Sequence, residues 1–164
     1  MSMEHLYETE TMAELCARQG RLSESIAIFR ELAESAADPD TRARARARLT
    51  TLEASWQPLR IAEVPPADLA LPPIPGVSLL VGDDQVTVAW ALPPETSSPA
   101  LDVLVLQRTP SGIDPQKKLL PLTQTSGRIG LLLPGVHSAL AAAGTVREGR
   151  FVSIVRSASS GRIF

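Results

Sequence analysis

Six prolines fall between positions 57 and 76, and this cluster constrains the fold more than any other feature of the sequence. Each proline fixes its φ angle and removes one backbone N–H donor, so the cluster excludes a helix and favours an extended, polyproline-like path. Residues 56–76 are therefore predicted to be a proline-rich linker, or a strap that lies along a neighbouring domain. The strap is favoured by the apolar residues of this segment, which are Leu59, Ile61, Val64, Leu69 and Leu71.

Residues 1–55, which precede the prolines, show the periodicity of short helices. Met12, Ala13, Leu15 and Cys16 form an apolar stripe at helical spacing. Gly20 follows this stripe and is placed to end the first helix, as a glycine just past a helix commonly does.

A second and a third helix are expected after this glycine. Ser23 is predicted to cap the second helix, because its hydroxyl oxygen can accept an orphan backbone N–H. Asp38 and Pro39 mark the start of the third helix, since aspartate suits the N-cap and proline suits the first helical position. The apolar faces are predicted to consist of Ile26, Phe29, Leu32 and Ala33 in the second helix and of Ala45, Leu49 and Leu52 in the third.

Arginine and alanine alternate in the third helix, with arginines at Arg42, Arg44, Arg46 and Arg48. Strict alternation also fits a strand, but alanine and arginine are strong helix formers without β-branching, so we predict a helix. Two interpretations of these arginines are open. In the first, the arginines form a solvated face, and the methylene groups of their side chains cover apolar surface. In the second, they form a docking site for an acidic partner or an RNA backbone.

Residues 77–164 are predicted to form short β-strands. Segments 77–81 and 86–90 flank a Gly82-Asp83-Asp84 turn and predict a hairpin, with Trp90 on its apolar face. Further strands are expected at 101–106, 128–133, 138–146 and 151–155. Short strands separated by regular turns are typical of a small antiparallel sandwich, in which Trp90 would be the core aromatic residue.

The predicted fold class is therefore α+β. Residues 1–55 form a helical hairpin plus a third helix, residues 56–76 a proline-rich linker or strap, and residues 77–164 an antiparallel β-sandwich.

The helical part resembles a single tetratricopeptide repeat over about 34 residues. The resemblance rests on Met12, Ala13 and Cys16 in the first helix, Gly20 between the helices, and Ser25, Phe29 and Leu32 in the second helix. Two residues depart from the pattern: Thr9 stands where a large apolar residue is usual, and Pro39 comes late. The resemblance implies a protein-binding unit, and a lone repeat implies that the β-region, a second copy or a partner covers its apolar face.

The C-terminal part resembles a bacterial domain of unknown function with an immunoglobulin-like or fibronectin-like sandwich. The matching residues are Ala143-Gly144 and the run from Gly149 to Ser157, with Trp90 and the strand 101–106 upstream. This resemblance implies a fold more than a function, because sandwiches host many unrelated activities.

The inventory of reactive residues is small. Cys16 is the single cysteine and is expected to be buried, while His5 and His137 are far apart in the sequence. No ligand set for a metal, no phosphate-binding loop and no nucleophile elbow are evident. Asp83 and Asp84 are interpreted as turn formers. We therefore predict that the protein is not an enzyme and that it needs no metal and no cofactor.

The net charge and the hydropathy pattern limit the kinds of partner and the cellular location that we expect. A net charge of −2 does not favour general binding to nucleic acid or to an anionic membrane. The first residues lack the pattern of a signal peptide, and no apolar run is long and unbroken enough to cross a bilayer. We expect a cytoplasmic protein, and the abundance of alanine, arginine, leucine and proline suggests a bacterial source.

The function expected from the sequence is that of an adaptor or scaffold. Its helical hairpin would bind another protein or a second copy of the chain. The residues predicted to support this binding are Leu15, Leu22, Ile26, Phe29, Leu32, Arg42, Arg44, Arg46 and Arg48. Two alternatives stay open: a sandwich that binds a small molecule or glycan near Trp90 or the Asp83-Asp84 turn, and RNA binding by the arginine-rich helix.

Overall fold

The computed structural model describes residues 9–63, 68–158 and 160–161 of the 164-residue chain. The chain forms two compact units. The helical unit consists of residues 1–58 together with Thr109–Asp114, and the sandwich unit consists of residues 59–108 and 115–164. His5, Val64, Pro65 and Pro66, which the sequence analysis named, lie outside the described residues.

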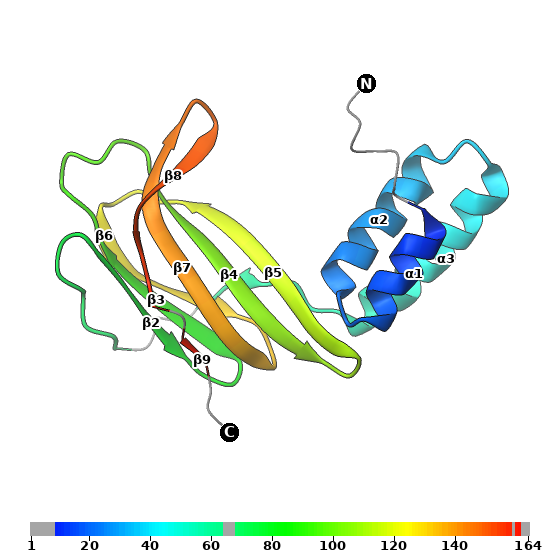
Figure 1. The fold of residues 1–164 in the computed structure, drawn as a ribbon, viewed down its shortest axis with the longest axis horizontal. Coiled ribbons are helices and arrows are strands. Elements are labelled where there is room, and N and C mark those ends of the chain that lie inside the picture. The colour runs from blue at the N-terminus through cyan, green and yellow to red at the C-terminus, as the bar shows by residue number, and fades with distance from the viewer. Residues whose placement is uncertain (1–8, 64–67, 159, 162–164) are drawn as a thin grey trace. The chain divides into compact units, whose positions relative to one another are not determined.

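Three helices lie side by side in the helical unit (Figure 1). They are α1 (Glu10–Arg18), α2 (Leu22–Ser35) and α3 (Pro39–Ser55). The hydroxyl oxygen of Thr9 caps α1 by accepting the N–H of Met12 over 3.2 Å. Gly20 has a φ of +80° and ends the first helix as predicted, while the N–H of Arg21 donates back to the carbonyl of Cys16 over 3.0 Å.

The third helix begins where the sequence predicts. Pro39 is its first residue, and the carboxylate of Asp38 accepts the N–H of Asp40 at 3.3 Å and the N–H of Thr41 at 2.9 Å. Hydrogen bonds from Thr41, its hydroxyl above all, lower the pKa of Asp38 from its ordinary value of 3.8. The prediction that alternating arginine and alanine form a helix is confirmed.

The predicted cap of the second helix is wrong. The N-cap position of α2 is Arg21, whose side chain makes no capping hydrogen bond. Ser23 lies inside the first turn, and its N–H and its hydroxyl both donate to Oδ1 of Asp114, at 3.1 and 2.6 Å. The acceptor for this helix end therefore comes from a residue 91 positions further along the chain.

The strands form two antiparallel sheets, so the α+β class and the C-terminal sandwich are confirmed. In chain order the strands are β1 (Arg60–Ile61), β2 (Gly76–Val81), β3 (Gln85–Ala91), β4 (Pro99–Thr109), β5 (Gly112–Pro121), β6 (Ser126–Leu132), β7 (Val136–Arg147), β8 (Arg150–Arg156) and β9 (Ser160–Gly161). Sheet A has the order β1-β6-β3-β2. Sheet B has the order β5-β4-β7-β8, and β9 also pairs with β7. Figure 1 shows the two sheets face to face.

The sandwich core lies between the inner faces of the two sheets. Sheet A contributes Val86, Val88 and Trp90 from β3, and sheet B contributes Leu101 and Val103 from β4. Trp90 is 6% exposed, which confirms it as a core aromatic residue, and its indole Nε1 donates to the carbonyl of Gln124 over 3.2 Å. The predicted hairpin is also present, with Val81 opposite Val86.

Part of the proline-rich segment packs on the sandwich. Leu59 is buried in the sandwich core, and β1 pairs with β6, where Ile61 lies opposite Leu131. The N–H of Ala62 donates to the carbonyl of Gly130 over 2.8 Å. These residues of the segment are therefore held against sheet A rather than extending freely.

Candidate functional site

Two small residues make a buried contact between the first two helices. The hydroxyl of Ser25 on α2 donates to the backbone carbonyl of Ala13 on α1 over 2.8 Å, and both residues are fully buried. No larger side chain would fit between the helices at this point without separating them. The small side chains of Ala13 and Ser25 thus allow α1 and α2 to pack closely at this point.

The apolar residues predicted to bind a partner divide into two groups. Ile26 and Phe29 are each 1% exposed and form the core of the helical unit, so they support the surface from beneath. Leu22 and Leu32 are half-buried and pack on the same core. Leu15 is 42% exposed, as is its neighbour Met12 at 41%, so these two residues form an apolar surface on α1.

Two of the four arginines form a ladder of ion pairs with the first helix. Arg48 pairs with Glu14 at 2.7 Å, and Arg44 pairs with Glu10 at 3.2 Å. In both pairs the partners are 34 positions apart, so α3 follows α1 with a constant register over one helical turn. The hydrogen bond and the charge of Glu10 raise the pKa of Arg44.

The other two arginines behave differently. Arg42 donates to the carbonyls of Ala36 and Ala37 and so satisfies the C-terminal end of α2. Arg46 is exposed, and within the described residues its guanidinium makes no hydrogen bond or ion pair; only its backbone carbonyl accepts a hydrogen bond, from the hydroxyl of Thr50 over 3.0 Å. The structure therefore brings Arg42, Arg44 and Arg48 into contacts within the helical unit and leaves the side chain of Arg46 exposed.

Sequence reasoning missed Asp114, a buried carboxylate of the helical unit that accepts hydrogen bonds from two other residues. This residue is fully buried, and besides the two hydrogen bonds from Ser23 it accepts the indole N–H of Trp56 at 3.1 Å. The tip of the β4–β5 hairpin also packs closely on Gly20, in the loop after α1. A Cβ atom at position 20 would lie only 2.6 Å from the backbone nitrogen of Gly112, so this close approach requires glycine. The only sequence signal was an aspartate before a proline, which by itself predicts a turn.

Cys16 and His137, two described residues that the sequence analysis considered for chemistry, belong to different units. Cys16 is 2% exposed, and burial is the first cause of its raised pKa, so the thiol is protonated at neutral pH. The ring Nδ1 of His137 lies 3.4 Å from the guanidinium of Arg108. Within residues 9–63 and 68–158 no cluster of histidine, cysteine or carboxylate side chains could hold a metal ion.

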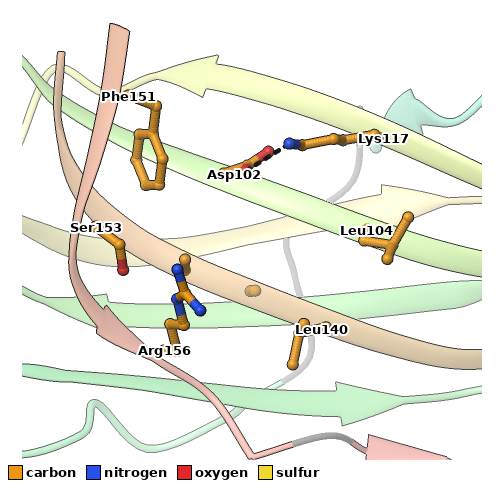
Figure 2. Close-up of a pocket in the computed structure, with 9 residues that line it drawn as sticks. Asp102, Leu104, Lys117, Leu140, Phe151, Ser153 and Arg156 are labelled. Atoms are coloured by element: carbon orange, nitrogen blue, oxygen red, sulfur yellow. Dashed lines mark ion pairs between the residues drawn. The ribbon is translucent and has the colours of Figure 1, made fainter.

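A pocket lies on the outer face of sheet B, away from the Trp90 and Asp83-Asp84 positions that the sequence suggested. It has a volume of about 250 Å³. Figure 2 shows Phe151, Ser153 and Arg156 along β8 on one side and an ion pair between Asp102 and Lys117 on the other. The Nζ of Lys117 is 3.0 Å from Oδ2 of Asp102.

The strand register explains why a pocket forms here. Ala142 on β7 lies opposite Asp102 on one side and opposite Arg156 on the other. A methyl group between two long side chains leaves a pit, because directly opposed residues on one face of a sheet are only about 5 Å apart. Leu104 and Leu140, which also oppose each other, form the next row of the same face.

None of the described helices has the length and apolar character needed to cross a membrane. Comparisons of the chain with protein-family models, with curated proteins and with solved structures gave no match.

Proposed function

We propose that the protein is a non-enzymatic adaptor that binds another protein, or a second copy of itself, through the exposed apolar side of α1. The observation that carries this proposal is the pair Met12 and Leu15, which are 41% and 42% exposed. The two residues are three positions apart, so they lie next to each other on one side of the helix.

The helical unit does not need this pair for its own core. The buried side of α1 consists of Ala13, Cys16 and Ala17, which pack against α2. Burying a leucine or methionine side chain is worth roughly 1.5–3 kcal/mol, so a partner that covered both residues would gain a substantial part of a binding free energy. Single exposed leucines are common, but an adjacent pair beside an otherwise complete core favours a contact surface.

The ion-pair ladder supports an interaction unit of the tetratricopeptide type. The constant 34-residue offset between Glu10 and Arg44 and between Glu14 and Arg48 equals the length of such a repeat. In this interpretation α3 takes the place of the first helix of a following repeat. The guanidinium of Arg46, which makes no hydrogen bond or ion pair within the described residues, would help to orient an acidic partner.

The proposal is tested by affinity purification of the tagged chain from its native cell, followed by mass spectrometry. The double variant Met12→Ser with Leu15→Ser should lose a protein that the wild-type chain retains. The control variant, Ala43→Ser with Ala47→Ser, changes two exposed residues of α3 and should retain it. Light scattering on the purified proteins distinguishes a second copy from a different partner. Equal recovery with all three chains, together with equal molar masses, would refute the proposal.

A further inference from the structure

The pit over Ala142 has an uneven distribution of charge. The residues around the pit lie on four adjacent strands of sheet B. In the order of the sheet they are Lys117 on β5, Asp102 on β4, Ala142 on β7 and Arg156 on β8. Lys117 balances the charge of Asp102 through an ion pair with its Oδ2, whereas Oδ1 of the same carboxylate is buried and has no hydrogen-bond partner within the described residues. Arg156 lies on β8, two strands away from Asp102, and the two side chains form no ion pair with each other.

Arg156 is therefore the group that determines the net charge of the pocket. Its guanidinium is exposed and makes no hydrogen bond or ion pair in the part of the chain that the structure describes. The hydroxyl of Ser153 lines the pocket on the same strand (Figure 2). A guanidinium beside a hydroxyl suits a carboxylate, because it can donate two parallel hydrogen bonds to the two oxygens.

The remaining walls of the pocket are apolar. Phe151 stands on one side of the pit, and Leu104 and Leu140 close the other (Figure 2). Leu140 is 39% exposed, so a ligand that covered it would remove apolar surface from water. The volume of about 250 Å³ is below the range of about 300–1,000 Å³ that is usual for drug-sized ligands. The pocket thus has room for a body the size of one amino-acid side chain.

We propose that this pocket binds a small monocarboxylate with an apolar body. The carboxylate pairs with Arg156 and accepts a hydrogen bond from the hydroxyl of Ser153, which gives up its long 3.5 Å hydrogen bond to the carbonyl of Val155. The apolar body lies over Ala142 between Phe151 and the two leucines. This site belongs to the sandwich unit, so it is independent of the adaptor surface on α1. One aromatic residue at the pocket provides little of the stacking surface that a glycan site requires.

The test is a titration of the ¹⁵N-labelled full chain with 3-phenylpropionate, followed by amide chemical shifts. The uncharged 3-phenylpropanamide is the matched ligand control. Shifts are expected at residues of β7 and β8 around the pit, with the amide binding at least about tenfold more weakly because it lacks the charge-assisted hydrogen bonds. Equal affinity for the two ligands, or no shifts at either side of the pit at millimolar ligand, would overturn the proposal.

Three variants test which residues of the pocket bind the carboxylate ligand. Arg156→Gln should weaken carboxylate binding at least about tenfold, whereas Arg150→Gln, which changes an exposed arginine at the far end of β8, should stay within about twofold of the wild type. Ala142→Phe should fill the pit and abolish binding. Since Arg156 is exposed, its replacement leaves the core intact, and unchanged affinity in Arg156→Gln would by itself refute the assignment.

Discussion

The hydroxyl of Ser23 donates a hydrogen bond of 2.6 Å to the carboxylate of Asp114, although 91 positions separate the two residues. The backbone N–H of Ser23 donates to the same oxygen. A carboxylate at the first turn of a helix satisfies orphan donors and interacts favourably with the helix dipole. The hairpin tip thus provides the acceptor that the sequence of α2 lacks at its own N-terminus.

Replacing Asp114 should destabilise the helical unit strongly. Asp114→Ala leaves the donors of Ser23 and Trp56 without their acceptor in a buried place, at a cost of about 1.5–3 kcal/mol in the free energy of unfolding. Urea denaturation followed by circular dichroism at 222 nm measures this change. The control Asp84→Ala removes an exposed carboxylate and should stay within about 0.5 kcal/mol of the wild type. Equal stability of the two variants would show that the buried carboxylate contributes nothing.

The contact between α1 and α2 should not tolerate a larger side chain at position 13. Ala13→Leu introduces three further carbon atoms where Ser25 contacts the backbone of α1, and it should lower the free energy of unfolding by about 1–3 kcal/mol through overpacking. The matched change Ala47→Leu, on the exposed side of α3, should have an effect below about 0.5 kcal/mol. Denaturant titration of both variants makes the comparison, and a tolerated Ala13→Leu would contradict the close helix contact.

The ion-pair ladder should contribute little to stability. The side chains of Arg48 and Glu14 are each 38% exposed, so solvent screens the pair and its coupling energy should be below about 1 kcal/mol. A double-mutant cycle of Arg48→Ala and Glu14→Ala measures this energy, which should decrease further as salt is added. A coupling well above this value that persists in high salt would show that the ladder is a structural element of the fold.

The cap of the third helix should make stability depend on pH in the acidic range. Because hydrogen bonds from Thr41 lower the pKa of Asp38 in the folded chain below its ordinary 3.8, the unfolded chain binds the proton more readily. The stabilisation is therefore fully present above that ordinary value and is lost as the pH falls through the folded pKa. The Tm difference between the wild type and Asp38→Ala should be a few degrees at neutral pH and should close in acid. A difference that is constant with pH would contradict this role.

Local patterns were sufficient to predict much of the fold. Gly20 and Pro39 mark helix ends through their own backbone conformations, and Asp38 does so through hydrogen bonds within one turn, so these signals are local in the sequence. Alternating apolar residues predicted the hairpin that contains Trp90 for a similar reason, since one buried face fixes the register.

The strand β5 was missed because its sequence contradicts its structure. It contains Pro115, Pro121 and two adjacent lysines, which do not predict a strand. It forms at the edge of sheet B, where prolines are tolerated because the edge does not require every backbone donor. The role of Asp114 depends on that missed strand.

The pocket on sheet B could not be predicted from any local pattern either. Ala142 is one of several alanines in β7, and only its register against Asp102 and Arg156 makes it the floor of a pit. Likewise, the periodicity of α1 could not show that Leu15 is exposed while Cys16 beside it is buried, because both belong to one apolar stripe.

The most direct test of the adaptor proposal is site-specific photo-crosslinking in the native cell. A benzophenone amino acid at position 15 should form a covalent adduct with a defined protein or with a second copy of the chain. The same residue at position 50, which is exposed on α3, should not form that adduct. No adduct at position 15, or the same products from both positions, would contradict the assignment of α1 as the binding surface.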